Sequence, residues 1–186
     1  MIILTGPSAS GKTLIAYQLQ KKYGIKKAIT STTREKRVNE VNGVDYYFVD
    51  KNCFLKMIED NLLVEHTIYN SNYYGCTKKE VGDNKVVVLE PEGLKNFKAL
   101  NDEHIVSFYI FAPEEIRHQR MIDRLDKEDK IKERLKNDKE RFDINKISNI
   151  DFIINNYNRD IDDVTDEIYL KYKKSIKEMD IFKFKY

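Results

Sequence analysis

The sequence predicts an α/β fold built on a mostly parallel sheet, and three observations carry this prediction. Short apolar runs alternate along the chain with segments whose apolar residues recur at helical spacing. A phosphate-binding loop signature stands between the first apolar run and the first helical segment. Short strand-like segments between residues 30 and 76 interrupt this alternation, which indicates a small β-rich subdomain inserted into the α/β core.

The first strand, loop and helix form one unit. Residues 1–5 are a short apolar run typical of a buried strand, and Leu14, Ile15 and Leu19 recur at helical spacing. The spacing predicts a helix over 12–22, with Gly24 as its C-cap. A short second strand is then predicted over 28–30.

The loop of this unit matches the pattern G-x-x-x-x-G-K-[ST]. The glycines let the backbone curl so that N–H groups point inward at an anion, and the helix adds its positive N-terminal end. Lys12 is expected to reach the β- and γ-phosphates of a nucleotide, and Thr13 to help hold Mg²⁺. The residues expected to bind the phosphates are Gly6, Pro7, Ser8, Ala9, Ser10, Gly11, Lys12 and Thr13.

The middle of the chain is rich in short strands. The Asn42-Gly43 pair is a hairpin signal, and a strand over 46–49 follows it. Apolar residues at helical spacing after Asp50, a suitable N-cap, predict a helix over 50–60. Two further segments complete this part, a strand over 62–69 and either a turn or a short strand over 72–76.

The second half returns to alternating strands and helices. Pro113 suits the first turn of a helix that continues to residue 123, and residues 123–141 are nearly all charged. The tail 181–186 alternates apolar and basic residues, which suits either an edge strand or a cover for the core. The other predicted elements are strands over 85–89, 105–111 and 150–154 and helices over 94–100 and 161–172.

Composition limits the classes of function. The 186 residues suit one domain, and 41% of them are hydrophobic, which is enough for a core. Charged residues reach 34% but nearly cancel to +2, which argues against nucleic-acid binding driven by bulk charge. No apolar run approaches the ~20 residues of a membrane span, and a first strand beginning at Met1 leads us to expect no signal peptide.

Cysteine and histidine usage points to a reducing compartment and to no metal cluster. Cys53 and Cys76 form no spaced framework, so we expect a cytoplasmic protein without a zinc site. His66, His104 and His118 lack metal-ligand spacing, and each is interpreted as structural or solvated rather than catalytic.

Several motifs beyond the loop resemble those of guanylate kinases. They are Ser31-Thr32-Thr33-Arg34 with Arg37, residues 40–49, residues 72–75, Phe111-Ala112-Pro113 followed by three arginines, and residues 151–156. The resemblance covers nearly the whole chain. It implies a P-loop NTPase three-layer fold in a single domain over 1–186. The implied parts are a core (1–30, 77–123 and 142–186), an inserted monophosphate-binding subdomain (31–76) and a helical lid (124–141).

The resemblance implies a second phosphate site in the insert. Arg34 and Arg37 match the residues that hold the acceptor phosphate, and guanidinium groups suit phosphate oxygens because they donate two parallel hydrogen bonds. Tyr46 and Tyr74 match residues that add hydroxyl donors. The alternative for these four residues is a solvated basic turn with two packing tyrosines.

Base recognition is also implied by position. Glu65 matches the carboxylate that accepts hydrogen bonds from the N1–H and 2-amino group of guanine, and its alternative is an exposed strand-end glutamate. Thr30 and Cys76 stand where the family usually has small hydroxyl residues near the base. A thiol is a weak donor, so Cys76 is expected to loosen selectivity.

The segment Glu90-Pro91-Glu92-Gly93 departs from the family pattern, which has two aspartates and a longer loop here. Glu90 is expected to act through water on Mg²⁺ or to pair with Lys12, because a carboxylate after a central strand faces the ligand crevice. Glu92 is expected to reach the guanine or its ribose. Pro91 suggests altered geometry at a strand end.

The lid is expected to supply positive charge. Arg120 and Arg124 lie four residues apart on one predicted helix and Arg134 follows, and all three match residues that close on the transferring phosphoryl group. The alternative is ordinary ion pairing on a helix surface. Asn156 is expected near the adenine, with Asn155 as the other candidate.

The resemblance therefore implies transfer of the γ-phosphoryl group of ATP to GMP or dGMP with Mg²⁺, giving ADP and GDP or dGDP. Two alternatives stay open, a kinase of the same fold with another phosphorylated acceptor and a non-catalytic guanylate-kinase-like binding domain. The expected partners are small nucleotides, with no nucleic acid and no membrane, and the protein is either a monomer or a homodimer.

Overall fold

The computed structural model describes residues 1–36, 40–69 and 71–183. Its core is a five-stranded sheet in the order β2-β7-β1-β8-β9, and all its pairings are parallel. This confirms the predicted parallel α/β class. The strands are β1 (Ile2–Thr5), β2 (Lys26–Lys27), β7 (Lys85–Val88), β8 (Val106–Phe111) and β9 (Phe152–Asn155).

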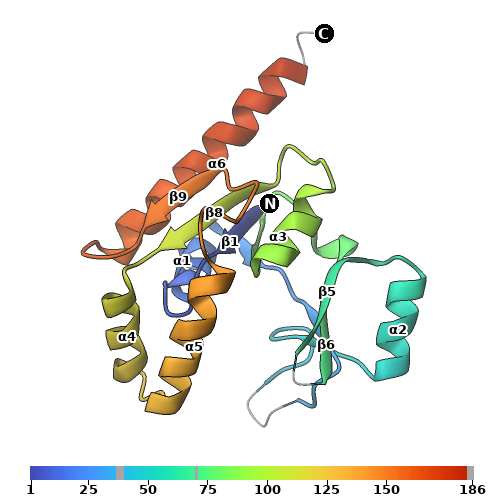
Figure 1. Cartoon of the computed structure of the whole chain (residues 1–186). Helices are drawn as coiled ribbons and strands as arrows, with labels where there is room; N and C mark the ends of the chain where they lie inside the picture. The colour runs from blue at the N-terminus through green and yellow to red at the C-terminus, as the bar shows by residue number, and fades with distance from the viewer. Residues whose placement is uncertain (37–39, 70, 184–186) are drawn as a thin grey trace.

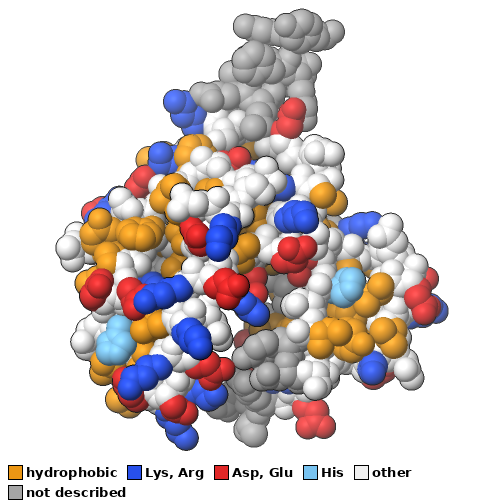
Figure 2. All heavy atoms as spheres, in the orientation of Figure 1, with side chains coloured by type: hydrophobic (Ala, Val, Ile, Leu, Met, Phe, Trp, Pro, Cys, Tyr) orange, Lys and Arg blue, Asp and Glu red, His pale blue; other side chains and the backbone are white. Residues whose placement is uncertain are grey.

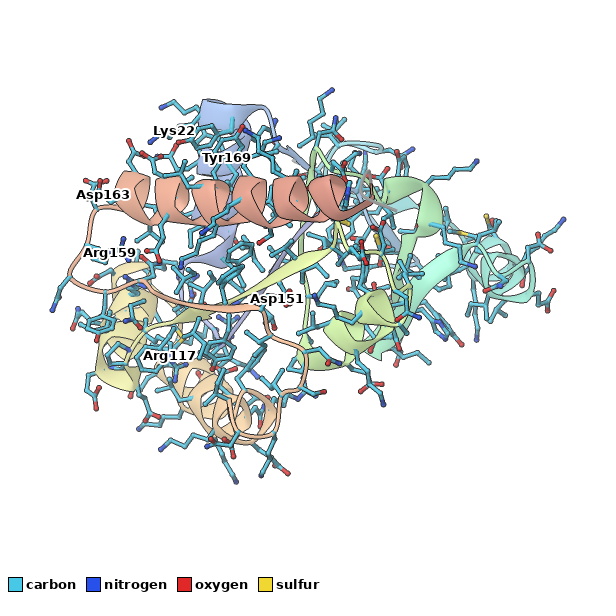
Figure 3. All side chains as sticks on the ribbon, turned by 90° about the horizontal axis from the view of Figure 1, so that it is seen from above. Lys22, Arg117, Asp151, Arg159, Asp163 and Tyr169 are labelled. Carbon is cyan, nitrogen blue, oxygen red and sulfur yellow. The ribbon has the colours of Figure 1, made fainter. Side chains whose placement is uncertain are left out.

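Helices cover both faces of this sheet, giving three layers (Figure 1). Ile2 and Leu4 of β1 pack with α1 and α6, whereas Ile3 between them packs with α3, because successive strand residues point to opposite faces. Figure 3 shows α6 lying along α1, where Tyr169 stacks on Tyr23. The helices outside the small sheet are α1 (Lys12–Tyr23), α3 (Pro91–Lys98), α4 (Glu114–Asp123), α5 (Glu128–Arg141) and α6 (Ile161–Lys183).

A second, smaller sheet lies beside the core, as the short strands of the middle segment predict (Figure 1). Its strand order is β4-β3-β6-β5, and α2 (Lys51–Glu59) accompanies it. Asp50 caps α2 as expected, accepting a 2.7 Å hydrogen bond from the backbone N–H of Cys53. The elements are β3 (Ser31–Thr32), β4 (Tyr47–Phe48), β5 (Leu63–Tyr69) and β6 (Asn72–Thr77), followed by the 3₁₀ turn η1 (Lys78–Glu80).

Two local predictions are wrong, and one of the two alternatives for the tail is excluded for residues 181–183. Residues 28–30 do not form the second strand, because they lead from the core sheet at β2 to the small sheet at β3. Pro91 does not distort a strand end but begins α3, where its missing N–H would have no helical partner in any case. Residues 181–183 continue α6, so they do not add an edge strand.

Charge is mixed over the surface, and Figure 2 shows positive and negative side chains interspersed on one face. Within the described parts of the chain, none of the helices combines the length and apolar character needed to cross a membrane.

The packing of α6 yields a stability prediction. Ile168 is 0% exposed in the cluster between α6, α1 and the sheet, so Ile168→Ala should lower the free energy of unfolding by about 2–5 kcal/mol. Leu170 on the same helix is 65% exposed, and Leu170→Ala should change the free energy of unfolding by at most ~0.5 kcal/mol. Urea unfolding of both variants measures the difference. Equal losses would contradict this assignment of the helix faces.

Candidate functional site

The loop after β1 is curled tightly against neighbouring backbone. Gly6 has φ 136°, and a Cβ there would lie 2.5 Å from the carbonyl oxygen of Ile110 on β8. Gly11 has φ 102°, and a Cβ there would lie 2.1 Å from Nδ2 of Asn156. Both motif glycines are therefore required by backbone conformation and by close approach. The loop ends directly in α1, so its amides and the helix N-terminus form the predicted anion cradle.

Lys12 is folded back onto this loop. Its ammonium donates to the carbonyl oxygens of Gly6 at 2.6 Å and Pro7 at 2.7 Å and to Oγ of Ser10 at 3.3 Å. Burial lowers the pKa of Lys12 to about 8, although the charges of Asp138 and Glu90 act to raise it. Phosphate oxygens in the cradle would replace the carbonyl acceptors and favour the charged form of Lys12.

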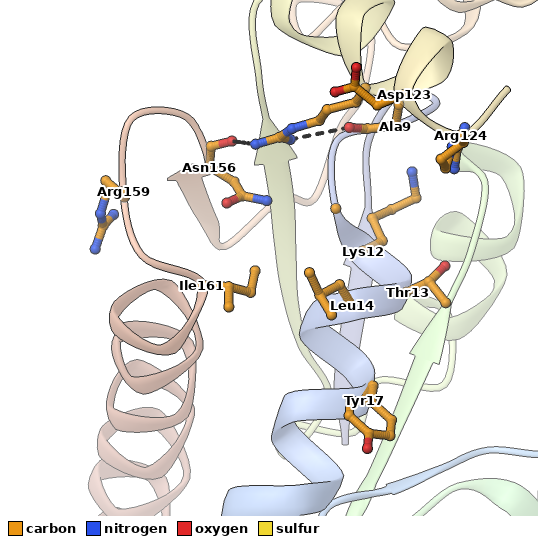
Figure 4. Close-up of a pocket in the computed structure, with 12 residues that line it drawn as sticks. Ala9, Lys12, Thr13, Leu14, Tyr17, Asp123, Arg124, Asn156, Arg159 and Ile161 are labelled. Atoms are coloured by element: carbon orange, nitrogen blue, oxygen red, sulfur yellow. Dashed lines mark hydrogen bonds between the residues drawn. The ribbon is translucent and has the colours of Figure 1, made fainter. Parts of the chain in front are cut away.

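A cavity of ≈ 680 Å³ opens beside the N-terminus of α1 (Figure 4). Arg120 crosses its edge, donating to the carbonyl oxygens of Ala9 at 3.2 Å and Asn156 at 2.8 Å. Asn156, 4% exposed, donates in turn to the carbonyl oxygen of Ser10 at 2.7 Å. Asn156 rather than Asn155 therefore contributes to this cavity, and with Arg120 it braces the loop.

The other two predicted lid arginines share one acceptor. Arg124 and Arg134 each donate to Oδ2 of Asp126, at 3.0 and 2.9 Å. Arg124 lines the cavity beside α1, and Arg134 lines a second cavity of ≈ 360 Å³ in front of the loop. The predicted ion-pair alternative is thus present, and a phosphate would have to compete with Asp126 for both side chains.

Two cavities meet at the carboxyl end of β7. The second cavity lies between the loop and α5 and includes Gly6 and Lys12. A third, of ≈ 340 Å³, lies between the core and the small sheet. Both are lined by residues 88–90, so a phosphate cradle and a further pocket share one wall at the crevice where α/β sheets bind ligands.

Glu65 carries a half-buried carboxyl in the third cavity. Burial raises its pKa to about 7, a nearby Glu90 adds to this rise, and a backbone hydrogen bond from Cys76 opposes it. The close approach of β6 to β5 beside Glu65 requires a glycine at position 75, because a Cβ on Gly75 would lie 2.8 Å from the carbonyl oxygen of Glu65. None of the described cationic side chains pairs with Glu65, so its carboxylate is suited to accept hydrogen bonds from a ligand.

Arg34 is held by a neighbouring acid and two rings. Its guanidinium donates to Oε1 of Glu40 at 2.6 Å and lies 5.6 Å from the ring centroid of Tyr46 and 5.7 Å from that of Phe48. Tyr46 and Tyr74 meet edge to face and line the third cavity together. Arg37 lies outside the described residues.

The remaining predicted residues divide into two groups. Thr30 and Glu92 line the third cavity. Glu90 lines both this cavity and the second one, and its carboxylate accepts from Arg141 at 3.1 Å rather than from Lys12.

The Cys76 side chain does not line the third cavity, because it is buried in the apolar cluster under β1 and β7, where desolvation raises its pKa to about 12. Only the backbone of Cys76 reaches the site, through Glu65.

Sequence reasoning missed three polar side chains that line the third cavity, those of His66, Thr67 and Asn96. Thr67 lies two residues beyond Glu65 on β5, so strand alternation places it on the same face. Asn96 lies one helical turn beyond Glu92 on α3. His66 was interpreted as structural or solvated, and no sequence pattern distinguishes its place at this cavity.

The donor set suits a cation that keeps most of its water. The described residues contain no group of three or more His, Cys, Asp or Glu side chains able to hold a metal. Mg²⁺ needs only one or two protein oxygens when phosphate and water supply the rest. Two such oxygens lie on either side of Lys12, the Thr13 hydroxyl in the cavity beside α1 and the exposed Glu90 carboxylate in the second cavity.

Comparisons with known proteins agree with this arrangement. The guanylate kinase family model matches residues 1–178. A guanylate kinase of Anaplasma phagocytophilum is 33% identical over 178 residues, covering 90% of this chain and 83% of the relative. One from Prochlorococcus marinus is 36% identical over 169 residues, covering 86% and 90%.

A solved structure agrees as well. The crystal structure of guanylate kinase from Anaplasma phagocytophilum superposes with a TM-score of 0.69 at 28% identity, covering 94% of this chain and 84% of that one. The family match spans the phosphate-binding loop, the small sheet and the helices around all three cavities. The chain therefore belongs to the guanylate kinase family.

Proposed function

We propose that this protein transfers the γ-phosphoryl group of ATP to GMP or dGMP, giving ADP and GDP or dGDP. One observation carries the proposal beyond family membership. The cavity at the phosphate-binding loop and the cavity that holds Glu65 share the wall formed by residues 88–90. A phosphotransferase must bring two anionic substrates together, and these adjoining cavities provide neighbouring places for them.

On the donor side, the loop backbone and Lys12 bind the triphosphate. Thr13 and Glu90 would hold Mg²⁺, which neutralises phosphate charge when bound. Arg120 and Asn156 keep the loop in its curled form through three hydrogen bonds to its own carbonyls and to each other, and the adenine occupies the adjoining cavity of ≈ 680 Å³. The donor side belongs to the proposed core, which comprises residues 1–30, 77–123 and 142–186.

On the acceptor side, the insert over residues 31–76 binds the monophosphate. The acceptor phosphate displaces Glu40 from the guanidinium of Arg34. Arg37 and the hydroxyls of Tyr46 and Tyr74 also donate hydrogen bonds to this phosphate. The Glu65 carboxylate accepts from the N1–H and 2-amino group of guanine. Thr30 and Glu92 lie in the same cavity and complete the contact with the base or ribose.

Catalysis needs alignment and charge neutralisation rather than a strong general base, because the acceptor phosphate is already an anionic nucleophile. The lid over residues 124–141 brings Arg134 to the transferring group, and Arg124 exchanges Asp126 for phosphate oxygens. Closure of the lid and the insert excludes water that would otherwise hydrolyse ATP.

We further propose that the protein acts in the cytoplasm on free nucleotides, with neither nucleic acid nor membrane as a partner, and as a monomer or homodimer. Two features support a reducing compartment and small partners. Cys53 is exposed and Cys76 is buried, both as free thiols, and the formal net charge is only +2.

Acceptor choice tests the proposal directly. ADP production should be measured with GMP, dGMP, AMP, CMP and UMP as acceptors. A pocket built around a carboxylate should favour GMP over AMP by about 10⁴-fold in kcat/KM, because adenine leaves Glu65 without its donor pair. Preference for another acceptor would replace the proposed substrate, and failure of all five would replace the proposed reaction.

Arg34 should matter for the acceptor alone. Arg34→Ala should raise the KM for GMP and lower kcat by at least about tenfold, since a charge-assisted contact to phosphate is lost, while ATP binding persists. Steady-state kinetics and ATP titration measure both effects. Lys56→Ala, an exposed cation on α2, is the control and should behave as wild type. Unchanged GMP kinetics in Arg34→Ala would remove this residue from the site.

The titration of Glu65 should appear in GMP binding. With a pKa of about 7 in the free protein, the ionised form that accepts from guanine is lost as pH falls through 7. The Kd for GMP should therefore rise about tenfold between pH 8 and pH 6. Glu65→Gln should bind more weakly and keep only the shallow pH dependence of the ligand phosphate itself. Parallel pH curves for the two proteins would contradict the assignment.

A further inference from the structure

We propose that Asp138 is a positioning residue that fixes one peptide plane of the phosphate-binding loop and fastens that loop to the lid helix α5. The proposal goes beyond the contacts between the protein and its nucleotides, and it rests on the proposed function only for its kinetic part. Its binding part requires ATP alone.

Asp138 is a buried carboxylate with three donors. It is 7% exposed. Its Oδ2 accepts from the backbone N–H of Ser8 at 2.8 Å and from Nη1 of Arg117 at 2.9 Å, and its Oδ1 accepts from Oγ of Ser8 at 3.2 Å. Arg117 is also 7% exposed, and Nη1 approaches the carbonyl oxygen of Ser8 at 3.4 Å. Both members of the ion pair thus form hydrogen bonds with Ser8 of the phosphate-binding loop.

The peptide unit between Pro7 and Ser8 is held at both ends. Its N–H donates to Asp138, and its carbonyl oxygen accepts from Lys12 at 2.7 Å and from the backbone N–H of Ser10 at 3.3 Å. When Lys12 leaves this carbonyl for a phosphate oxygen, the bond to Asp138 still prevents rotation of the peptide plane. The next residue, Ala9, has φ 58°, a conformation that a residue with a side chain adopts only under constraint.

The same carboxylate joins segments that are distant in sequence. Ser8 belongs to the loop, Arg117 to α4 and Asp138 to α5, and Figure 3 shows Arg117 where α4 and α5 meet. Arg134 and Arg141 stand four residues before and three after Asp138, hence on the same face of α5. Both line the cavity in front of the loop. Fastening α5 at Asp138 therefore also sets where these arginines stand relative to the triphosphate.

Arg117 offsets the cost of burying the Asp138 carboxylate beside the phosphate-binding loop. An uncompensated negative charge beside the loop would repel the triphosphate, and its burial would be costly. The guanidinium of Arg117 neutralises the charge of Asp138. The carboxylate can therefore accept its three hydrogen bonds without presenting a net negative charge to the nucleotide.

A purely structural role makes a different prediction. Replacing both members of a buried ion pair by apolar residues of similar volume often leaves stability unchanged, whereas removing one member leaves a buried charge. Stability therefore does not separate the two roles. Nucleotide affinity does, because an apolar pair fills the space but accepts no hydrogen bond from Ser8.

The test is the double variant Arg117→Met/Asp138→Leu. We expect a thermal midpoint near that of wild type and a Kd for MgATP raised at least tenfold in titration calorimetry. In turnover assays kcat should fall, while the KM for GMP stays within twofold. The control removes an exposed ion pair of α5, Glu128 and Lys132, by Glu128→Leu/Lys132→Met, and should bind MgATP as wild type. A folded double variant with wild-type MgATP affinity would overturn the proposal.

Two single variants decide the matter if the double variant does not fold. Asp138→Asn keeps an acceptor for the Ser8 N–H, and Asp138→Ala does not. We expect MgATP affinity within threefold of wild type for the first and at least tenfold weaker for the second. Equal affinities would overturn the proposal. Because these titrations need no acceptor, they stand even if wild-type protein fails to phosphorylate GMP.

Discussion

The close approach of the phosphate-binding loop to its neighbours is the constraint on which the site depends. At Gly6 the loop touches the backbone of β8, and at Gly11 it touches the side chain of Asn156 after β9. The parallel order of β1, β8 and β9 brings these ends together. A side chain at either glycine would separate the loop from them. The curled backbone, and hence the direction of its amides, therefore follows from the sheet order as much as from the local motif.

Every described cation expected at the phosphates has a protein acceptor. Lys12 and Arg120 donate to backbone carbonyls, Arg34 to Glu40, and Arg124 and Arg134 to Asp126. Under the proposed function, phosphate binding is thus an exchange of acceptors rather than the ordering of free side chains. Such an arrangement lowers the entropic cost of binding but requires the ligand to compete with existing bonds. Substrates with several charges are best able to do so.

The sequence predicted those features that local patterns determine. The loop, the cap at Asp50 and the parallel character of the core sheet follow from spacing and residue type, whereas the order of its strands was not predicted. Pro91 was misjudged because proline suits both an irregular strand end and the first turn of a helix, and in the structure it begins α3. Cys76 was misplaced because a position in a motif does not tell how deeply a side chain is buried. Its register with Glu65 puts it on the cavity side of β6, but its thiol packs into an apolar cluster of the core. Asp138 escaped notice because it belongs to a nearly all-charged segment, and its burial depends on Ser8, 130 residues away.

Glu90 shows how the two halves of the site depend on each other. Its carboxylate lines both the cavity at the loop and the one at Glu65, and it accepts from Arg141 at 3.1 Å. Its charge acts to raise the pKa of Lys12 and of Glu65 alike. A cation bound to the Glu90 carboxylate would offset its negative charge and so favour the ionised form of the Glu65 carboxyl. Under the proposed function, a cation bound with the donor nucleotide would therefore also favour the ionised form of Glu65, because Glu90 lies close to both cavities.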